Sequence, residues 1–205
     1  MYADLSIKAY LARAGSAAPV PGGGSVAALG ASLAAALTQM VAGLTVGRKG
    51  FEAVEPEMKE VLSAAAALER RCVADIDRDP EAYGQVLAAY RLPKGSAADK
   101  AARGRAIQAA MKQAALVPLA LAERVRRILE LAGAVVCKGN PNAVGDGAVA
   151  AMMARSAGLA AIHNVRINLA AIDDGDFVAE TMHKINRLEQ EFVDGEKEIL
   201  QAITV

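Results

Sequence analysis

The sequence predicts an all-α protein: one domain, residues 1–205, built as a bundle of about seven helices. The chain contains 47 alanines, 54% hydrophobic residues and only 3% aromatic residues. Alanine is the best helix former and a poor strand former. The apolar stretches are long and do not alternate with the period of two that a half-buried strand shows. An alanine-rich core also implies close contact between helices.

Breaks in the apolar pattern divide the chain into these helices. Prolines and glycines cluster at residues 19–24, 93–95 and 139–141. They interrupt helices because proline lacks an N–H and glycine lowers helical stability. The helices are expected at about 2–14, 23–47, 53–78, 80–91, 97–137 (bent near Pro118), 143–171 and 174–203.

Individual residues support several of these boundaries. Gly24 or Ser25 is expected to open the second helix. Asp79 followed by Pro80 is a favoured N-cap and first-turn pair, so a new helix is expected there. Ser96 and the residue three positions on have the spacing of a capping box. The first helix is expected to turn Leu5, Ala9 and Ala12 inward. The last carries one apolar stripe and should pack on one side only: Val178, Met182, Ile185, Leu188, Phe192, Ile199 and Ile203.

A stretch of 34 residues between Arg13 and Arg48 contains no charged residue. A membrane span needs about 20 predominantly apolar residues, and Ser25 to Val46 is long enough. The stretch is nevertheless rich in Ala, Gly, Ser and Thr, contains Gln39 and has no aromatic belt. We therefore expect a central helix packed on all sides within a bundle and no membrane contact, with a membrane span as the alternative.

Charge, aromatic content and cysteine use narrow the function classes. Lys plus Arg and Asp plus Glu each number 23, and no nucleic-acid partner is expected because that binding needs a basic surface. Tryptophan is absent, which disfavours a stacking platform. Cys72 and Cys137 lack the spacing of zinc or disulfide motifs. Asp4, Lys8 and Arg13 interrupt any signal-peptide pattern, so a cytoplasmic location is expected.

The first candidate for chemistry is Pro21-Gly22-Gly23-Gly24-Ser25, which leads into a long helix. Glycines let the backbone approach a ligand closely, and free N–H groups with the helix dipole attract an anion. The segment formally matches the GxGxxA dinucleotide fingerprint, but no strand precedes it and the P-loop lysine is missing. The alternatives are a ligand-binding loop that takes no nucleotide and a tight turn between two helices.

A second loop, from Gly139 to Asp146, repeats this logic before another alanine-rich helix. It contains Asn140 and Asn142. Asn142 and Asp146 are four residues apart and share one face if the helix starts by residue 142. Ordinary capping by Asn142 and a favourable first-turn position for Asp146 are the alternative explanations.

Acidic residues form a third cluster at positions 75–81. The segment begins like a calcium loop, but Pro80 stands where an EF-hand needs Gly, and Val86 stands where it needs Glu. No metal site is therefore expected. Asp79, next to the apolar Ala82 and Tyr83, is the carboxylate most expected to point inward.

The predicted apolar helix near residue 164 contains several polar residues. Asn164 and Asn168 lie one helical turn apart with Arg166 between them, and buried polar groups are costly unless they are paired or functional. His163 is expected to be a structural residue. The sequence shows no Ser-His-Asp or Cys-His arrangement.

Six segments, in order along nearly the whole chain, form one recognisable set: Pro21–Ala28, Gly43–Thr45 with Gly47–Lys49, Asp79–Tyr83, Ala89–Lys94, Gly139–Asn142 and Asn164–Leu169. In these segments the chain resembles the cyclodeaminase/cyclohydrolase family of folate enzymes. The family includes the formiminotetrahydrofolate cyclodeaminase domain of formiminotransferase-cyclodeaminase and stand-alone methenyltetrahydrofolate cyclohydrolases.

The resemblance implies an all-helical subunit that forms a homodimer and acts on a tetrahydrofolate derivative without a metal, nucleotide or other cofactor. The sequence leaves open which of the two reactions is catalysed, and a non-catalytic folate-binding or helical interaction protein is the alternative class. Family members often have Ser-Asp where this chain has Gly145-Asp146. Many cyclohydrolases have Lys-Lys-Lys-Tyr where this chain has Arg48-Lys49-Gly50-Phe51.

Both reactions need a placed acid or base, and a carboxylate near the cationic carbon also stabilises its charge. We expect Asp79 and Asp146 to be the catalytic residues, one as base and the other holding the pterin or water. Lys49 or Arg48 would meet the glutamate carboxylates of the folate tail. The expected substrate-binding residues are Pro21, Gly22, Gly23, Gly24, Ser25, Arg48, Lys49, Tyr83, Asn140, Asn142, Asn164 and Asn168.

Overall fold

The computed structural model describes residues 1–203, so residues 204 and 205 of the predicted domain lie outside it. Six α-helices and two 3-10 helices form the described chain, which contains no strand. The predicted all-α class is therefore confirmed, with six helices in place of seven. In chain order they are η1 (Tyr2–Asp4), α1 (Ile7–Ala14), α2 (Gly23–Gly43), α3 (Glu55–Tyr90), α4 (Ala97–Lys138), η2 (Pro141–Ala143), α5 (Val144–Leu169) and α6 (Gly175–Gln201).

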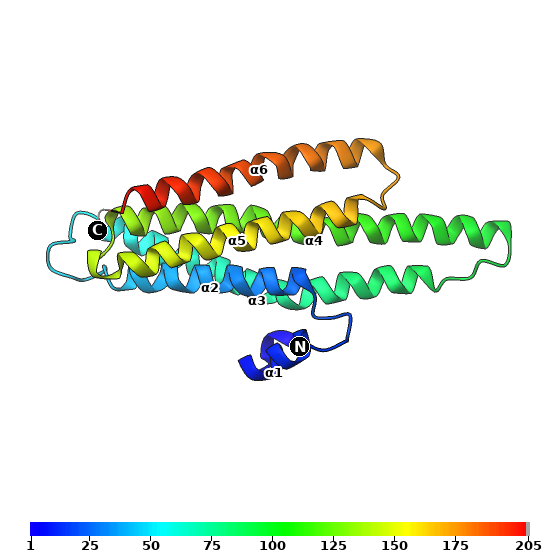
Figure 1. Ribbon diagram of the computed structural model, residues 1–205, viewed down its shortest axis with the longest axis horizontal. Helices are drawn as coiled ribbons and strands as arrows, with labels where there is room; N and C mark the ends of the chain where they lie inside the picture. The colour runs from blue at the N-terminus through cyan, green and yellow to red at the C-terminus, as the bar shows by residue number, and fades with distance from the viewer. Residues whose placement is uncertain (204–205) are drawn as a thin grey trace.

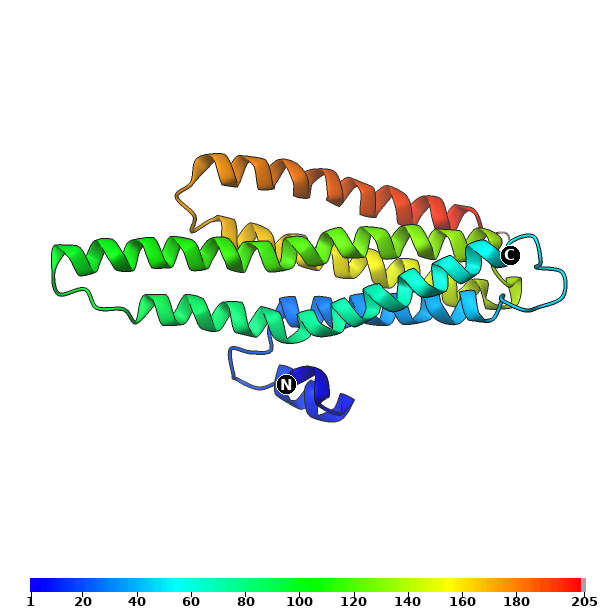
Figure 2. The same ribbon diagram turned by 180° about the vertical axis from the view of Figure 1, so that it is seen from behind.

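Helices α2 to α6 form an elongated bundle (Figure 1). The two longest, α3 with 36 residues and α4 with 42, run side by side and extend beyond the other helices as a hairpin. Helix α2 packs against α3 and α5, while α6 packs against α4 and α5. Figure 2 shows the opposite side, where α3 and α4 cross in front of α2 and α5. One face of the α2–α5 pair consequently has no helix over it.

The core is built from small side chains, as the composition predicts. Ala28, Ala31 and Ala35 of α2 are fully buried. Phe192 of α6 fills the space over Gly158 of α5, where an added Cβ would lie only 2.5 Å from the ring. The predicted apolar stripe of the last helix is also confirmed at its centre, where Ile185, Leu188 and Phe192 are buried.

Helix α1 lies off the bundle (Figure 1). The prediction that Leu5, Ala9 and Ala12 face inward is wrong, because all three are exposed. The only buried residue of α1 is Tyr10, whose hydroxyl lies 3.0 Å from Ser25 Oγ. Helix α1 therefore contacts the core through Tyr10 and the partly buried Ala14, and the Tyr10 hydroxyl adds a polar anchor.

One continuous helix, α3, replaces the two helices predicted at 53–78 and 80–91, and Asp79 caps no helix. Pro80 lies inside α3, where it has no N–H for the carbonyl of Ile76. The hydroxyl of Ser25 donates to that carbonyl oxygen at 2.8 Å. Because a neighbouring helix supplies the missing donor, the chain passes through Pro80 without ending the helix.

Pro118 in α4 presents the same problem and finds the same kind of solution. Its ring leaves the carbonyl of Ala114 without a backbone donor. The side-chain amide of Asn168 in α5 donates to this oxygen at 2.9 Å. At each proline, a side chain from another helix donates to the carbonyl that the proline leaves unpaired. These two hydrogen bonds link α2 to α3 and α5 to α4.

The helix ends agree in part with the sequence analysis. Ser96 and Asp99 form the predicted capping box at the start of α4. Helix α2 begins at Gly23, as the expected range 23–47 has it, but Gly22 and not Gly24 or Ser25 is its N-cap, and the helix already ends at Gly43. Asn140 accepts from the N–H of Asn142, so Asn140 performs the capping that was expected of Asn142.

Helix α2 is not packed on all sides, contrary to the prediction. Within the described residues it is the one helix long and apolar enough to cross a membrane, and about half of that stretch (50%) is buried. Its outward residues and those of α5 form one largely apolar surface, which we call the outer face. The outer face is marked by six apolar residues that are 41–59% exposed: Val26, Leu33 and Met40 of α2, and Val149, Met152 and Ile167 of α5.

The bond between Ser25 and Ile76 predicts a double-mutant result. Ser25→Ala leaves a buried carbonyl unpaired and should cost about 1–3 kcal/mol, because an unsatisfied buried acceptor loses its solvation. Pro80→Ala restores the backbone donor, so the same Ser25→Ala change should cost less in that background. Thermal unfolding of the four proteins measures this coupling.

Ser32→Ala is the matched control. Ser32 is also a buried serine of α2, but its hydroxyl donates to the carbonyl of Ala28 within its own helix. This change should have a small effect with or without Pro80. Equal losses for Ser25→Ala in both backgrounds would contradict the role assigned to Pro80.

Candidate active site

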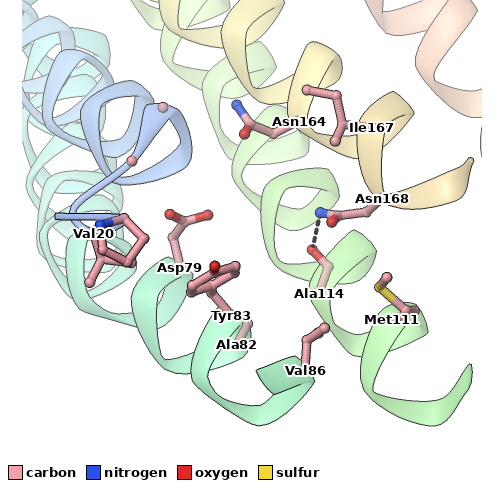
Figure 3. A pocket seen from close by; sticks show the side chains of 13 residues that line it. Val20, Asp79, Ala82, Tyr83, Val86, Met111, Ala114, Asn164, Ile167 and Asn168 are labelled. Carbon is pink, nitrogen blue, oxygen red and sulfur yellow. Dashed lines mark hydrogen bonds between the residues drawn. The ribbon is translucent and has the colours of Figure 1, made fainter. Parts of the chain in front are cut away.

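A cavity of about 280 Å³ lies where the loop before α2 meets α3, α4 and α5 (Figure 3). Its size is near the lower end of small-molecule sites, which run from about 300 to 1,000 Å³. The loop contributes Pro19, Val20, Gly22 and Gly23. Helix α3 contributes Asp79, Ala82, Tyr83 and Val86. The remaining wall is Met111 and Ala114 of α4, with Asn164, Ile167 and Asn168 of α5.

Asp79 sits against the N-terminus of α2. Its Oδ2 accepts from the backbone N–H of Ser25 at 3.2 Å. An added Cβ at Gly24 would lie 2.1 Å from Asp79 Oδ1, so only glycine allows this approach. The third glycine of this loop is therefore needed because the Asp79 carboxylate occupies the space of a side chain. The loop does more than reverse the chain between two helices.

Burial gives this carboxylate an unusual protonation behaviour. Loss of solvation raises the pKa of Asp79, and the hydrogen bond from the Ser25 N–H opposes that rise. No lysine or arginine lines the cavity among the described residues to balance the charge. A carboxyl group with a raised pKa is a stronger base once ionised, which suits proton transfer near neutral pH.

Two asparagines of α5 complete the polar part of the wall. Asn164 Nδ2 donates to the Ala160 carbonyl, and Asn168 Nδ2 donates to the Ala114 carbonyl, each at 2.9 Å. Each amide thus uses one of its two N–H groups, which leaves one further N–H to donate and the Oδ1 to accept. In Figure 3 Asp79 and the two asparagines lie on opposite sides of the cavity. The site offers acceptors to a ligand that carries N–H groups or positive charge.

A hydrogen-bonded chain supports the site from behind. The single hydroxyl hydrogen of Ser25 goes to Ile76, so Tyr10 must donate to Ser25 Oγ. Burial raises the pKa of Tyr10, which keeps this donor protonated. The buried carboxylate of Asp77 accepts from the N–H groups of Tyr2 and Ala3 and ties down the N-terminal segment.

The acidic cluster at 75–81 serves separate neighbours and does not form a calcium loop. Asp75 is buried and pairs with Arg124 of α4 and with Arg78. Asp77 holds the N-terminus, and Asp79 lines the cavity. Within residues 1–203 no group of three His, Cys, Asp or Glu side chains is placed to hold a metal ion.

The structure gathers about half of the predicted site. Gly22, Gly23, Asp79, Tyr83, Asn164 and Asn168 line the cavity. Ser25 and Gly24 contact Asp79 from behind, and Pro21 is buried in the same loop. Sequence reasoning missed the apolar wall of Pro19, Val20, Ala82, Val86, Met111, Ala114 and Ile167, since apolar residues carry no chemical signal; only the proline four residues after Ala114 marks that position.

The other predicted residues lie at the opposite end of the bundle. Asp146 is about 27 Å from Asn164 along α5, because a helix rises about 1.5 Å per residue. Asn140 bridges two segments there. Its backbone N–H donates to Thr45 Oγ1 at 2.9 Å, and its amide donates to the Leu44 carbonyl at 3.2 Å. Asn142 is exposed next to it.

Arg48 and Lys49 also lie at this end, in the turn after α2. Gly47 and Gly50 bracket them with positive φ angles of 72° and 93°. Both cations are exposed, and neither forms an ion pair within the described chain. The fold of this chain therefore does not bring Asp79 together with Asp146, Arg48 or Lys49.

Comparison with known proteins decides the family. The profile of the formiminotransferase-cyclodeaminase family matches residues 6–187. The chain belongs to this family. The resemblance noted in the sequence is thereby confirmed.

The relatives of this chain are named for two different enzymes, a cyclohydrolase and a cyclodeaminase. The chain is 38% identical over 188 residues to a methenyltetrahydrofolate cyclohydrolase of Methylorubrum extorquens, covering 92% of this chain and 90% of that protein. It is 35% identical to the formimidoyltransferase-cyclodeaminase of Rattus norvegicus, but spans only 35% of that protein's length. The crystal structure of formiminotetrahydrofolate cyclodeaminase from Thermotoga maritima matches with a TM-score of 0.88 at 27% identity, covering 97% of this chain and 96% of that one.

The raised pKa of Asp79 predicts how stability depends on pH. The native state holds this proton more tightly than the unfolded chain, so the free energy of unfolding falls as pH rises from the ordinary value of 3.8 through the raised pKa. Asp79→Asn removes the buried charge while keeping an acceptor for Ser25. We expect a higher Tm for this variant at about pH 7 and no difference below about pH 4.

Asp176→Asn is the control for this prediction. Asp176 is exposed in the first turn of α6, so its replacement removes a charge that is not buried. A rise in Tm of about 2–4 °C corresponds to roughly 1 kcal/mol in a domain of this size. A lower Tm for Asp79→Asn at neutral pH would contradict the prediction, because it would show that the charged Asp79 carboxylate stabilises the folded state.

Proposed function

We propose that this protein is a methenyltetrahydrofolate cyclohydrolase, which hydrolyses 5,10-methenyltetrahydrofolate to 10-formyltetrahydrofolate. Its family acts in folate one-carbon chemistry, and the cyclohydrolase of Methylorubrum extorquens is 38% identical and matched over 90% of its length. The observation that carries the proposal is the half-buried Asp79 carboxylate, which lines a cavity without a cation and accepts from the N–H of Ser25.

The substrate's chemistry suits this cavity. The methenyl carbon shares a positive charge with the two nitrogens that flank it, and a carboxylate held beside it stabilises that charge in a water-poor site. The pterin presents an amino group and ring N–H groups. The oxygens of Asn164 and Asn168 can accept from these groups, while each amide nitrogen already uses one of its two N–H groups within the chain.

Asp79 acts as the base in the proposed step. A water oxygen forms a bond to the methenyl carbon while Asp79 takes one water proton. The bond from this carbon to N5 then breaks, N5 acquires a proton, and the carbon remains on N10 as a formyl group. The net reaction consumes one water and releases one proton, so no redox or group-transfer cofactor enters its balance.

Formiminotetrahydrofolate cyclodeaminase is the second candidate. The likeness to the Rattus norvegicus and Thermotoga maritima proteins favours it. In that reaction N10 attacks the formimino carbon, and ammonia leaves with a proton that an acid such as Asp79 can supply. Both reactions occur at the same carbon, so the same cavity serves either one.

An absorbance assay tests the function. Purified protein is mixed with 5,10-methenyltetrahydrofolate, and loss of the near-ultraviolet band is followed against buffer. We expect enzymatic decay, and Asp79→Asn should lower turnover by about tenfold or more with folding intact, as loss of a general base does. Glu81→Gln, two residues away on the exposed side of α3, should leave the rate unchanged.

The outcomes separate the candidates. Absence of decay, together with ammonia release from 5-formiminotetrahydrofolate, would replace the cyclohydrolase by the cyclodeaminase. Thermal stabilisation by a folate without either reaction would indicate a non-catalytic binding protein. Wild-type turnover in Asp79→Asn would contradict the assigned base.

We also propose a cytoplasmic homodimer that forms through the outer face. Its six marker residues are apolar and exposed on one face, and apolar residues grouped in this way mark an interaction surface. Leu33→Glu places a charge at its centre and should convert dimer to monomer in light scattering. Leu92→Glu, at another exposed leucine, on the tip of the α3–α4 hairpin, should leave the mass unchanged. A monomeric wild type would contradict the proposal.

A further inference from the structure

The α3–α4 hairpin carries a concentration of positive charge that the fold does not neutralise. Residues 84–110 include a single acidic residue, Asp99, although the whole chain is neutral. The same segment contains five cations, which we call the hairpin cations: Arg91, Lys94, Lys100, Arg103 and Arg105. None of the five forms an ion pair within the described chain, whereas ten of the other eighteen lysines and arginines do. A surface with unpaired charges of one sign attracts an anion.

One face of the hairpin leads from the cavity to these cations. Asp79, Tyr83 and Val86 of α3 line the cavity. Tyr90 lies four residues after Val86 and eleven after Asp79, so it continues the same face of the helix. Tyr83 and Tyr90 are 42% and 46% exposed, and the hairpin extends beyond the other helices (Figure 1). The path from Asp79 to Tyr90 is about 16 Å long, since a helix rises about 1.5 Å per residue.

Arg103 is fixed at the far end of this face. Its Nε and Nη2 donate to the Tyr90 carbonyl at 3.2 and 3.1 Å, and its guanidinium lies over the Tyr90 ring, 5.5 Å from the ring centre. These bonds use two of its five N–H groups. The other three can bind a carboxylate in the planar, paired geometry that arginine favours. Closing the end of α3 therefore explains only part of Arg103, and it explains none of the other hairpin cations.

A folate has a tail that matches this arrangement. Its pterin is joined through a p-aminobenzoyl ring to glutamate, and further glutamates can follow through γ-linked amide bonds, each adding a carboxylate. When the reacting carbon lies beside Asp79, a tail that leaves past Tyr83 runs toward the hairpin cations. Arg48 and Lys49 are not within its reach in this fold, because the 21 residues of α2 place them about 30 Å from the cavity.

We propose that the α3–α4 hairpin is a second binding subsite, which takes the γ-linked glutamates of a folate whose pterin lies in the Asp79 cavity. Tyr83 and Tyr90 line the path of the tail. Arg103 binds a carboxylate through its free N–H groups, and the other hairpin cations bind the carboxylates of later glutamates. The inference rests on the proposed function for the identity of the ligand, and on the charge and geometry of the hairpin for its position.

Kinetics with substrates of different tail length test the subsite. We expect the triglutamate form of 5,10-methenyltetrahydrofolate to have a KM about tenfold below that of the monoglutamate form, because its added carboxylates meet several cations. The kcat should be the same for both, since the subsite lies about 16 Å from the reacting carbon. Arg91→Ala/Lys94→Ala/Lys100→Ala removes three hairpin cations and leaves the Arg103 bonds intact. This variant should raise the triglutamate KM by about tenfold and keep the wild-type kcat.

Arg70→Ala/Lys184→Ala/Lys197→Ala is the matched control. It removes the same charge from three exposed cations outside the hairpin that also lack ion pairs within the described chain. The control should keep the wild-type KM for both substrates. An equal rise in KM in the control would show an effect of net charge alone and would overturn the subsite. Equal KM values of the wild type for the two tail lengths would overturn it as well.

A binding measurement separates this inference from the proposed function. The probes are pteroylmonoglutamate and pteroyltriglutamate, which lack the reacting carbon, and titration calorimetry gives their Kd. The wild type and the control should bind the triglutamate about tenfold more tightly, with a difference that shrinks as salt is added. The hairpin variant should bind both alike. If this difference is present while both folate activities are absent, the proposed function fails and the subsite stands. If turnover is present and Kd is independent of tail length, the subsite fails.

Discussion

The hydrogen bond from the Ser25 hydroxyl to the Ile76 carbonyl is the contact on which the site depends. It exists because Pro80 cannot supply the donor of a regular helix. It fixes the start of α2 against α3, and this places Asp79 over the first turn of α2 with room only for glycine at position 24. The Asn168–Ala114 bond beside Pro118 does the same for α4 and α5. The four parts of the chain that line the cavity are thus held in place by Ser25 and Asn168, which donate to the two carbonyls that the prolines leave unpaired.

The same arrangement explains why a charged group is tolerated in an alanine-rich interior. Asp79 receives one backbone hydrogen bond from a helix N-terminus, where a negative charge is favoured. That is too little to offset its burial, so its pKa stays above the ordinary value. Asp75, which is more buried, has Arg124 and Arg78 as partners. Of these two carboxylates on one helix, Asp75 therefore forms a structural ion pair, while Asp79 remains available for chemistry.

Local patterns predicted much of this protein, and interactions between distant segments account for what was missed. Alanine content gave the fold class, and the glycine loop, Asp79, Tyr83 and the two asparagines were identified before the structure. Pro80 was misjudged because the donor that keeps α3 intact comes from Ser25, 51 residues away. The exposure of α2 was misjudged because the absence of charged residues does not tell whether other helices cover all sides of a helix or only some of them. Asp146 was grouped with Asp79 by residue type, although they stand at opposite ends of the subunit.

The central claim is that a folate binds in the Asp79 cavity, and a crystal structure of the protein with a bound tetrahydrofolate derivative tests it most directly. The account predicts the pterin between the start of α2 and the end of α5. A carbon at the methenyl position should face Asp79, and the pterin N–H groups should lie within hydrogen-bond distance of Asn164 or Asn168. A pterin bound in any other groove of the bundle, with this cavity unoccupied, would contradict it.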